Sequence, residues 1–299
     1  MPPRLTAIWR PWTMRLQVSA TIIRLVVIVF GFLIVISLWG FYASIRPPKI
    51  VSSLTPRQLN MGYEDVSFGT ADGLTLRGWH IPSARSTEKT LILLHGYPAD
   101  KGDILPALAF LHQDFNLLLF DFRYLGKSDG SYSTAGAKEV EDLLAAIRFL
   151  KTRGVKEVGA WGFSMGGAVA LMTITRAPEI RAVIAESSYA SLARMAFELF
   201  RIPLVNYPIG YLVGFWARLF LGIDLGEVSP VECVRNAKIP ILLIHSSDDA
   251  VIPFSHAQSL RDALANNPRA EFWFHEGFAH GQLGAEYQSR VKNFFHNNL

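Results

Sequence analysis

Three polar clusters in this sequence carry the residue types that nucleophilic acyl transfer requires. They are Ser164 in GFSMGG, the neighbouring Asp248 and Asp249 in HSSDDAVIP, and His280 in GFAHG. A serine hydroxyl becomes a nucleophile when an imidazole accepts its proton and a carboxylate orients that imidazole. The chain presents these groups in the order nucleophile, acid, base, each directly after an apolar run that predicts a strand.

Ser164 is predicted to lie on a sharp turn between a strand and a helix. An apolar run rich in strand formers ends at GFSMG, and a helical pattern of small and apolar residues follows at once. Glycines at 162 and 166 fit such a turn, because side chains there would clash with the neighbouring backbone. The following helix would direct free N–H groups and its positive dipole end toward a developing oxyanion.

The pattern G-x-S-x-G occurs a second time, at residues 126–130, around Ser128. A predicted strand ends just before it, but a polar loop rich in glycine and serine follows it in place of a helix. Context rather than the five-residue pattern identifies a nucleophile, so Ser128 is interpreted as a turn residue and Ser164 as the nucleophile.

Short apolar strands alternate with helical patterns along most of the chain. This alternation predicts an α/β fold, with a mostly parallel sheet that helices cover on both faces. A hairpin is expected at its start, over 64–68 and 74–81. Further strands are expected at 90–94, 116–122, 182–185, 241–245 and 271–275, and helices at 103–112, 138–153, 255–265 and 286–296. Functional groups of such sheets gather at the carboxyl ends of the strands, where the polar clusters fall.

One segment, at about 191–228, does not follow this alternation. It is rich in aromatic and aliphatic residues, but Pro203, Asn206, Pro208 and Arg218 interrupt it, which argues against a second membrane span. We expect a short helical cap over the sheet; the alternative is an ordinary pair of core helices.

From about residue 64 to its C-terminus, the chain resembles α/β-hydrolases of the serine-hydrolase branch. More narrowly, it is similar to membrane-tethered, prolyl-oligopeptidase-like or serine-aminopeptidase-like members. Five segments carry the resemblance: HGYPAD (95–100), DFRYLGKSDG (121–130), GFSMGG (162–167), HSSDDAVIP (245–253) and GFAHG (277–281).

The resemblance implies a role for each catalytic candidate. The family segment H-G-x-x-D-x-x-V-P aligns its aspartate with Asp249, although Ser246 stands where the family has glycine, and Asp248 is the alternative acid. His280 matches the family's base. The oxyanion donors would be the backbone N–H groups of Met165 and Tyr97.

Four aromatic residues are candidates for contact with the substrate. Tyr124 replaces a glycine of the family's D-x-R-G-x-G loop, which would either narrow the mouth of the pocket or reshape a turn. The other candidates are Phe163, beside the nucleophile, and Phe200 and Trp216 in the expected cap.

The N-terminal segment 25–45 contains no charged residue and is long enough to cross a bilayer. It is predicted to be a transmembrane anchor, because no cysteine or small-residue cleavage site typical of a processed signal follows it. Residues 1–24 carry four arginines and no acid, which predicts a cytoplasmic N-terminal arm and a hydrolase domain (61–299) on the outer, periplasmic or lumenal, side. The proline-containing segment 46–60 is expected to be a linker that holds this domain off the membrane.

Composition argues against several kinds of partner. The formal charge of +4 equals the contribution of the four N-terminal arginines, so the remaining chain is neutral and lacks the basic surface that nucleic acids require. Cys233 is the only cysteine, which excludes an intrachain disulfide and a cysteine-based metal site. We expect neither a metal nor an organic cofactor.

These observations predict a membrane-anchored serine hydrolase that cleaves a carboxylic ester or thioester with an apolar or lipid-like acyl group through an acyl-enzyme. The first alternative is a peptidase or aminopeptidase of the same fold, which would need a charged recognition group in the cap, where Arg194, Glu198, Arg201 and Arg218 occur. The second is a non-catalytic binding or scaffold member of the fold.

Overall fold

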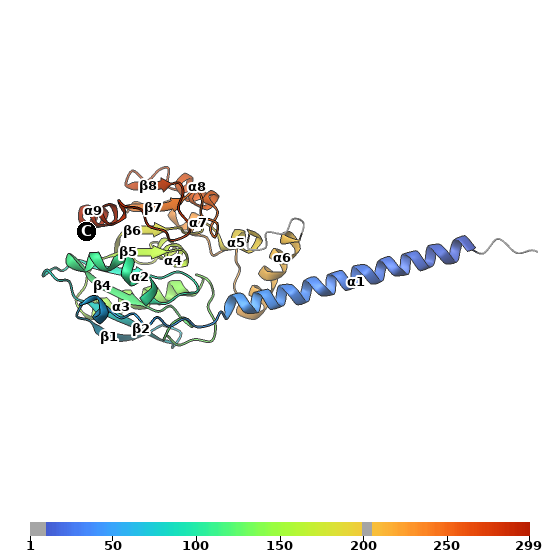
Figure 1. Ribbon diagram of the computed structural model, residues 1–299, viewed down its shortest axis with the longest axis horizontal. Helices are drawn as coiled ribbons and strands as arrows, with labels where there is room; N and C mark the ends of the chain where they lie inside the picture. Colours follow the sequence, from blue (N-terminus) through green and yellow to red (C-terminus); the bar gives the residue numbers. More distant parts are fainter. Residues whose placement is uncertain (1–9, 199–204) are drawn as a thin grey trace, which may run out of the picture.

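In the computed structural model, the described part of the chain comprises residues 10–198 and 205–299, with side chains described from residue 20 onward. Within it, one eight-stranded sheet has the order β1-β2-β4-β3-β5-β6-β7-β8 (Figure 1). The strands are β1 (Glu64–Gly69), β2 (Thr75–Ile81), β3 (Thr90–Leu94), β4 (Asn116–Phe120), β5 (Val158–Phe163), β6 (Ile180–Glu186), β7 (Ile241–Ser246) and β8 (Ala270–His275). β2 pairs antiparallel with β1 and β4, and the other neighbours pair in parallel, so the predicted mostly parallel sheet is confirmed.

Helices cover both faces of this sheet because its central strands are apolar on both sides. In β3, Ile92 and Leu94 face one core cluster, whereas Leu91 and Leu93 face the other. The first cluster is closed by α3 (Glu139–Thr152), α4 (Met165–Thr173), α7 (Pro230–Val234) and α8 (Phe254–Ala263). The second is closed by α2 (Lys101–Leu108), its 3-10 continuation η2 (Ala109–Gln113) and α9 (Tyr287–Asn298).

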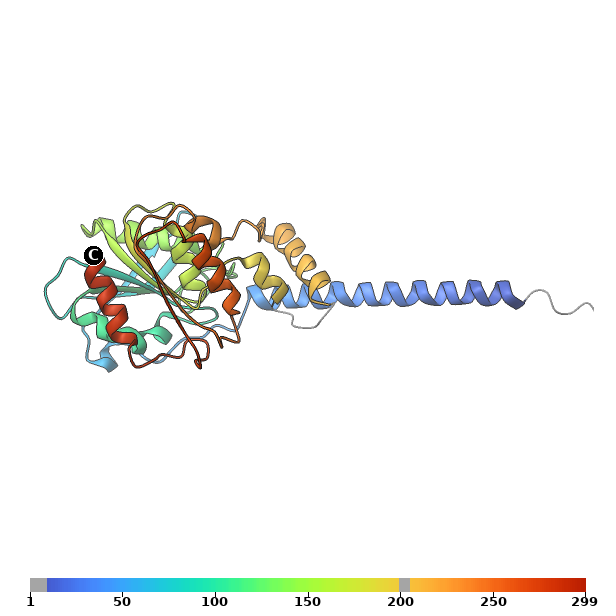
Figure 2. The ribbon, with the colours of Figure 1, turned by 90° about the horizontal axis from the view of Figure 1, so that it is seen from above.

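The N-terminal segment forms one long helix, α1 (Arg10–Ile45), which projects from the domain (Figure 2). Its portion Ala20–Ile45 is long and apolar enough to cross a membrane, with a mean hydropathy of 2.8 and only 6% of its most apolar window buried. This portion of α1 is therefore a candidate membrane span by its length and composition.

The end of α1 and the segment 46–60 that follows it are both bonded to the domain. The Ser133 N–H donates to Ile45 O (2.9 Å), so the end of α1 contacts the domain directly. The Ser52 N–H and hydroxyl both donate to Asp100 (2.7 Å each). The Tyr124 hydroxyl donates to Pro47 O (2.8 Å), so a side chain of the domain also pairs a backbone carbonyl of this segment.

Helices follow β6 in the segment where we expected a cap. They are α5 (Leu192–Glu198), α6 (Asn206–Trp216) and a turn of π-helix, η3 (Ala217–Leu221); we refer to α5, α6 and η3 together as the cap. The cap packs beside the end of α1 as well as near the sheet (Figures 1 and 2). Trp216 Nε1–H donates to Ser37 Oγ (3.0 Å), and the rings of Phe41 and Phe220 stack at 6.2 Å.

Candidate active site

Ser164 occupies the turn between β5 and α4, with φ 52° and ψ −115°. Residues other than glycine rarely adopt this backbone conformation, which costs of order 1–3 kcal/mol. Strained backbone of this kind concentrates at functional sites. The surroundings enforce it: a Cβ on Gly162 would lie 2.4 Å from Gly166, and one on Gly166 would lie 2.5 Å from Leu94 O. The Ser164 N–H also donates to Glu186 O (2.8 Å), which fixes the turn to the next strand.

Asp249 and His280 meet at the carboxyl ends of β7 and β8. His280 Nδ1 lies 2.7 Å from Asp249 Oδ2, while Asp249 Oδ1 accepts the N–H groups of Val251 (2.8 Å) and Ile252 (2.9 Å). Burial raises the pKa of the Asp249 carboxyl, but the hydrogen bonds from His280 and the two amides outweigh burial and keep this pKa below its usual range. The carboxylate is therefore ionised at neutral pH and can accept a hydrogen bond from His280 Nδ1–H.

The His280 ring is held from its other side by Phe163. The two ring centroids lie 4.7 Å apart. Gly96 and Gly281 border the same phenyl ring so closely that a Cβ on either would approach it to 2.8 or 2.9 Å. With Nδ1 engaged by Asp249, Nε2 is the ring nitrogen left to accept a proton.

Asp248 has different partners, although it is the neighbour of Asp249. Its Oδ2 accepts the Gly277 N–H (2.7 Å) and the Ser247 hydroxyl (3.1 Å). Ser246, at the position where the resemblance implied glycine, accepts the N–H groups of Asp248 (3.2 Å) and Phe278 (3.3 Å). Both side chains thus join the loop after β7 to the loop that carries His280, a structural role that the sequence analysis missed.

Three other histidines have structural partners. His95 Nε2 accepts the Phe122 N–H (3.0 Å), and His245 Nε2 lies 2.9 Å from Ile252 O, beside the Asp249 turn. Burial lowers the pKa of both rings, so they are neutral at pH 7. His256, which no motif indicated, accepts the Ala190 N–H at Nδ1 (2.9 Å) and donates from Nε2 to Glu198 (2.7 Å), and so joins α8 to the cap.

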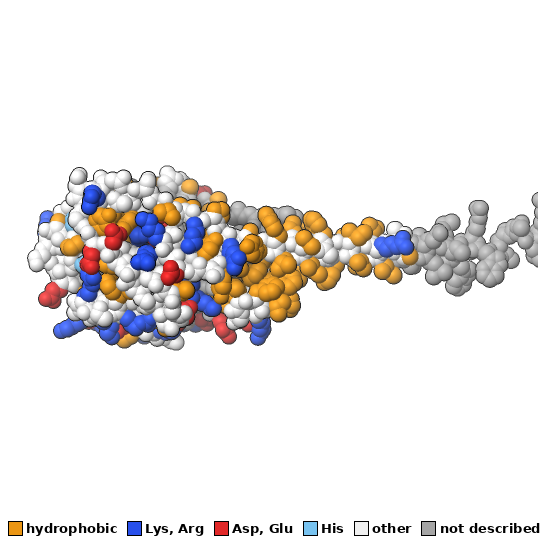
Figure 3. Space-filling view, turned by 90° about the horizontal axis from the view of Figure 1, so that it is seen from below, with side chains coloured by type: hydrophobic (Ala, Val, Ile, Leu, Met, Phe, Trp, Pro, Cys, Tyr) orange, Lys and Arg blue, Asp and Glu red, His pale blue; other side chains and the backbone are white. Residues whose placement is uncertain are grey.

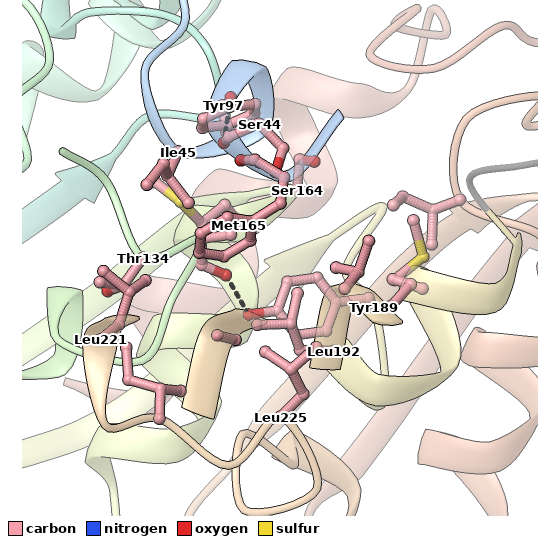
Figure 4. Close-up of a pocket in the computed structure, with 18 of the residues that line it drawn as sticks. Ser44, Ile45, Tyr97, Thr134, Ser164, Met165, Tyr189, Leu192, Leu221 and Leu225 are labelled. Carbon is pink, nitrogen blue, oxygen red and sulfur yellow. Dashed lines mark hydrogen bonds between the residues drawn. The ribbon is translucent and has the colours of Figure 1, made fainter. Parts of the chain in front are cut away.

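A cavity of about 240 Å³ lies over Ser164 (Figure 4). Its lining is almost entirely apolar, and no charged side chain is among its described lining residues. Ser164, Met165 and Tyr97 contribute from the sheet side, so the two expected oxyanion residues border the same space as the serine. Met165 is the first residue of α4, and its N–H belongs to the helix-terminal group that has no acceptor within the helix.

The cavity has a second contributor that the sequence analysis did not foresee, the end of α1. Phe41, Ser44 and Ile45 line it together with the cap residues Val213, Ala217 and Leu221. The Tyr97 hydroxyl donates to Ser44 O (2.6 Å), which ties this end of α1 to the loop after β3 (Figure 4).

The remaining aromatic candidates lie elsewhere. Phe163 contacts His280 rather than lining the cavity, and Phe200 lies outside the described residues. Trp216 faces α1. Tyr124 adopts φ 67° at the position where the family has glycine, and its hydroxyl holds Pro47 O, so its substitution serves a turn and the 46–60 segment and does not narrow the cavity.

The second G-x-S-x-G segment has no such surroundings. The Ser128 hydroxyl is buried, donates to Asp121 O (2.6 Å) and accepts the Arg77 N–H (2.9 Å). It stabilises a turn, as the sequence context indicated. Within the ranges whose side chains are described, no group of three or more His, Cys, Asp or Glu side chains is arranged to hold a metal ion.

Comparisons with known proteins agree with this architecture. A family model for the alpha/beta hydrolase fold matches residues 89–223. The uncharacterized protein YfhR of Escherichia coli (strain K12) is 35% identical over 217 residues, 69% of each chain, and protein bem46 of Schizosaccharomyces pombe is 29% identical over 209 residues, 67% of this chain and 64% of bem46. The structure of the Pyrococcus furiosus esterase Pf2001 matches with a TM-score of 0.72 at 29% identity, over 85% of this chain and 99% of the esterase. The chain therefore belongs to the α/β-hydrolase family.

Proposed function

We propose that this α/β-hydrolase is a membrane-anchored serine hydrolase that cleaves a carboxylic ester or thioester of an apolar acyl group. The observation that carries the proposal is the 2.7 Å contact between Asp249 and His280, at the same sheet edge as a serine held in a strained turn. The esterase among the structural relatives supports the same reaction class.

In the proposed reaction, His280 Nε2 takes the proton of Ser164 as its oxygen attacks the acyl carbonyl. Asp249 stabilises the imidazolium, and the N–H groups of Met165 and Tyr97 stabilise the oxyanion. Collapse of this intermediate breaks the bond to the leaving alcohol or thiol, which receives the proton from His280. Water, activated by His280 in turn, then releases the acid and restores Ser164.

The cavity supports an apolar acyl group over a peptide. A peptidase would need a charged group to recognise a peptide terminus, and no charged side chain is among the described lining residues. Of the candidates in the cap, Arg194 pairs with Glu198 (2.8 Å) and Arg218 faces Asp224 (3.6 Å), while Arg201 lies outside the described residues.

The membrane part of the proposal rests on α1 and on the arginines that precede its apolar segment. It assigns a single span, a cytoplasmic N-terminus and a hydrolase domain on the outer side. A reporter that is active only in the cytoplasm, fused to the C-terminus, tests this orientation: activity of the reporter would refute it.

A fluorophosphonate probe tests the nucleophile, because it reacts covalently with activated serines. We expect the wild-type protein and Ser128→Ala to be labelled, and Ser164→Ala to remain unlabelled. Labelling that persists in Ser164→Ala would refute the assignment, and absence of labelling in the wild type would favour a non-catalytic member of the fold. Nitrophenyl esters of increasing chain length, compared with aminoacyl naphthylamides, separate an esterase from a peptidase.

A further inference from the structure

The cap and α1 form one continuous structural unit. Trp216 donates to Ser37 Oγ (3.0 Å) and Phe220 stacks on Phe41, so that Ser37 and Phe41 are only 0% and 4% exposed on a helix whose other side chains are mostly exposed. The cap therefore covers one side of α1 within the apolar portion Ala20–Ile45.

Among the described residues, the cap also carries a row of exposed apolar side chains. Tyr207, Tyr211, Phe215 and Leu219, which we call the cap stripe, follow one another at intervals of four residues along α6 and η3. Their exposed fractions lie between 53% and 70%. Residues spaced by four lie on one side of a helix, and a cluster of large apolar side chains of this kind marks an interaction surface.

Exposed apolar side chains also gather where the domain meets α1. Figure 3 shows hydrophobic side chains gathered at the junction of the domain and α1, without a break between them. Trp39 and Tyr42 of α1 are 70% and 54% exposed beside this junction. Tryptophan and tyrosine are enriched where a membrane meets water, because their rings are apolar and their N–H or O–H groups are polar.

Charge is almost absent from this part of the cap. Arg218 is the one charged residue between Asn206 and Leu221. Its side chain is 77% exposed and extends toward Asp224. A long arginine side chain can lie along apolar surface while its guanidinium reaches water.

The positions along α1 of its contacts with the cap indicate how deep in a bilayer these contacts would lie. At a rise of 1.5 Å per residue, Ser37 lies about 20 Å and Phe41 about 26 Å along the helix from Arg24, the last basic residue before the uncharged run. The hydrocarbon layer of a bilayer is about 30 Å thick. If Arg24 lies at one boundary, both contacts lie within the layer or at its far boundary, and a cap bound there cannot be surrounded by water.

We infer that α6 and η3 lie in the membrane interface beside α1 with the cap stripe among lipid acyl chains, and that an amphiphilic lipid ester enters the cavity from the bilayer at the end of α1 and the cap, which both line it. Because α1 and the cap both line the cavity over Ser164, a lipid that contacts them in the membrane is next to this cavity. The substrate class is an ester whose acyl chain is solvated by the membrane and whose carbonyl lies at the interface. This inference rests on the proposed function, for both the anchor and the nucleophile.

A lipid environment fits the cap stripe better than a second copy of this chain does. In the proposed anchor, lipid surrounds the exposed side of α1, and the stripe belongs to the cap that packs against this helix. A second chain that covered the stripe would leave the exposed apolar side of α1 uncovered, whereas lipid covers both at once.

Quenching of a fluorophore by lipid tests the location of the cap stripe in the full chain. In a Cys233→Ser background, single cysteines are introduced as Tyr211→Cys in the stripe, Val27→Cys in α1 and Glu157→Cys before β5. Each is labelled with an environment-sensitive dye and reconstituted in phosphatidylcholine vesicles with or without doxyl-labelled acyl chains. Val27 is 64% exposed, and the Glu157 side chain is 62% exposed at the opposite end of the parallel strands from Ser164.

We expect doxyl lipid to quench the labels at 27 and 211 by several-fold relative to the label at 157. Quenching at 27 but not at 211 would overturn the inference and leave the proposed anchor intact. A lack of quenching at 27 would refute the anchor, and with it the premise of the inference. If the fluorescence of the label at 211 changes with the protein-to-lipid ratio and not with doxyl lipid, the stripe binds a second copy of the chain, and the inference is overturned.

A kinetic measurement tests the entry path separately. Leu219→Glu places a charge on the cap stripe, and Phe272→Glu places one at a 40%-exposed apolar position on β8 as the control. The readout is the rate on a long-chain ester in vesicles divided by the rate on a soluble acetate ester. We expect this ratio to fall on the order of tenfold for Leu219→Glu, because a carboxylate in the interface opposes insertion, and to stay unchanged for the control. An unchanged ratio for Leu219→Glu would overturn the entry path while both variants still report whether the nucleophile is active.

Discussion

Replacing Asp249 by asparagine should abolish most of the activity without disturbing the fold, for a reason that lies in its hydrogen bonds. Oδ1 accepts two backbone N–H groups, from Val251 (2.8 Å) and Ile252 (2.9 Å), and Oδ2 faces His280 Nδ1. The asparagine oxygen must stay with the two amides, since an NH₂ group there would oppose two donors. Its NH₂ group is then turned toward His280.

Two donors cannot face each other, so His280 must place its proton on Nε2 and accept with Nδ1. In that tautomer Nε2 has no lone pair for the proton of Ser164. The same exchange in a serine protease triad lowers kcat by about 10⁴-fold, which corresponds to roughly 5.4 kcal/mol of transition-state stabilisation. The asparagine amide keeps the hydrogen bonds of the Asp249 side chain, but its bond to His280 no longer involves a charge. We therefore expect the free energy of unfolding to fall by only about 1 kcal/mol.

Steady-state hydrolysis of a nitrophenyl ester, together with thermal unfolding, measures both effects. The matched control is Asp248→Asn, whose carboxylate accepts the Gly277 N–H and faces no catalytic candidate; we expect its kcat to stay within about tenfold of the wild type. A kcat for Asp249→Asn within tenfold of the wild type would refute the tautomer argument. An equal loss in both variants would point to the loop as a whole rather than to Asp249.

Three further substitutions test other contacts. Burial raises the pKa of Glu186 from 4.5 to about 7, while the Tyr287 hydroxyl donates a hydrogen bond to its carboxyl group. Between these pH values the folded protein keeps the carboxyl proton and the unfolded chain loses it. The free energy of unfolding should therefore fall as the pH rises from 4.5 to 7. Glu186→Gln should remove that fall, of about 3 kcal/mol, in urea unfolding at pH 5 and pH 8. Gly281→Ala, at φ +75° and with its Cβ 2.9 Å from the Phe163 ring, should displace His280 and lower kcat about tenfold at unchanged KM in ester hydrolysis. Trp216→Phe, which loses the hydrogen bond to Ser37, should make amide exchange in α6 about fivefold faster by mass spectrometry, and an unchanged rate would show that this bond does not hold the cap.

The sheet could be predicted because the sequence of each strand by itself indicates a strand. The run LILL at 91–94 is apolar on both sides, as a strand between two helical layers must be, and the structure puts alternate residues into the two cores. The strand-to-helix turn at Ser164 was equally local, since only glycine fits at 162 and 166. Once the strands were assigned, their carboxyl ends brought the three catalytic candidates to one edge of the sheet.

The contacts of α1 and the cap could not be predicted from the same kind of pattern. Trp216 and Ser37 are separated by 179 positions, and neither residue has a local periodicity that names its partner. The segment 46–60 has the composition of a spacer, and only the positions of Asp100 and Tyr124 in the folded domain show that it binds along the surface. For Phe163, its place next to the serine predicted contact with the substrate, whereas its ring supports His280.

The exposure of side chains along α1 indicates that this helix does more than attach the domain, because its end is also part of the candidate site. Phe32 and Val35 are 63% and 67% exposed, as the proposed anchor requires. Further along the helix, Ser37 and Phe41 are almost fully buried, and Ile45 lines the cavity over Ser164. A helix that served only to attach a domain would need no buried side of this kind, because attachment depends on apolar length alone. The last turns of α1 therefore belong to the candidate site as well as to the proposed anchor, and the cavity over Ser164 has its full lining only when both α1 and the domain are present.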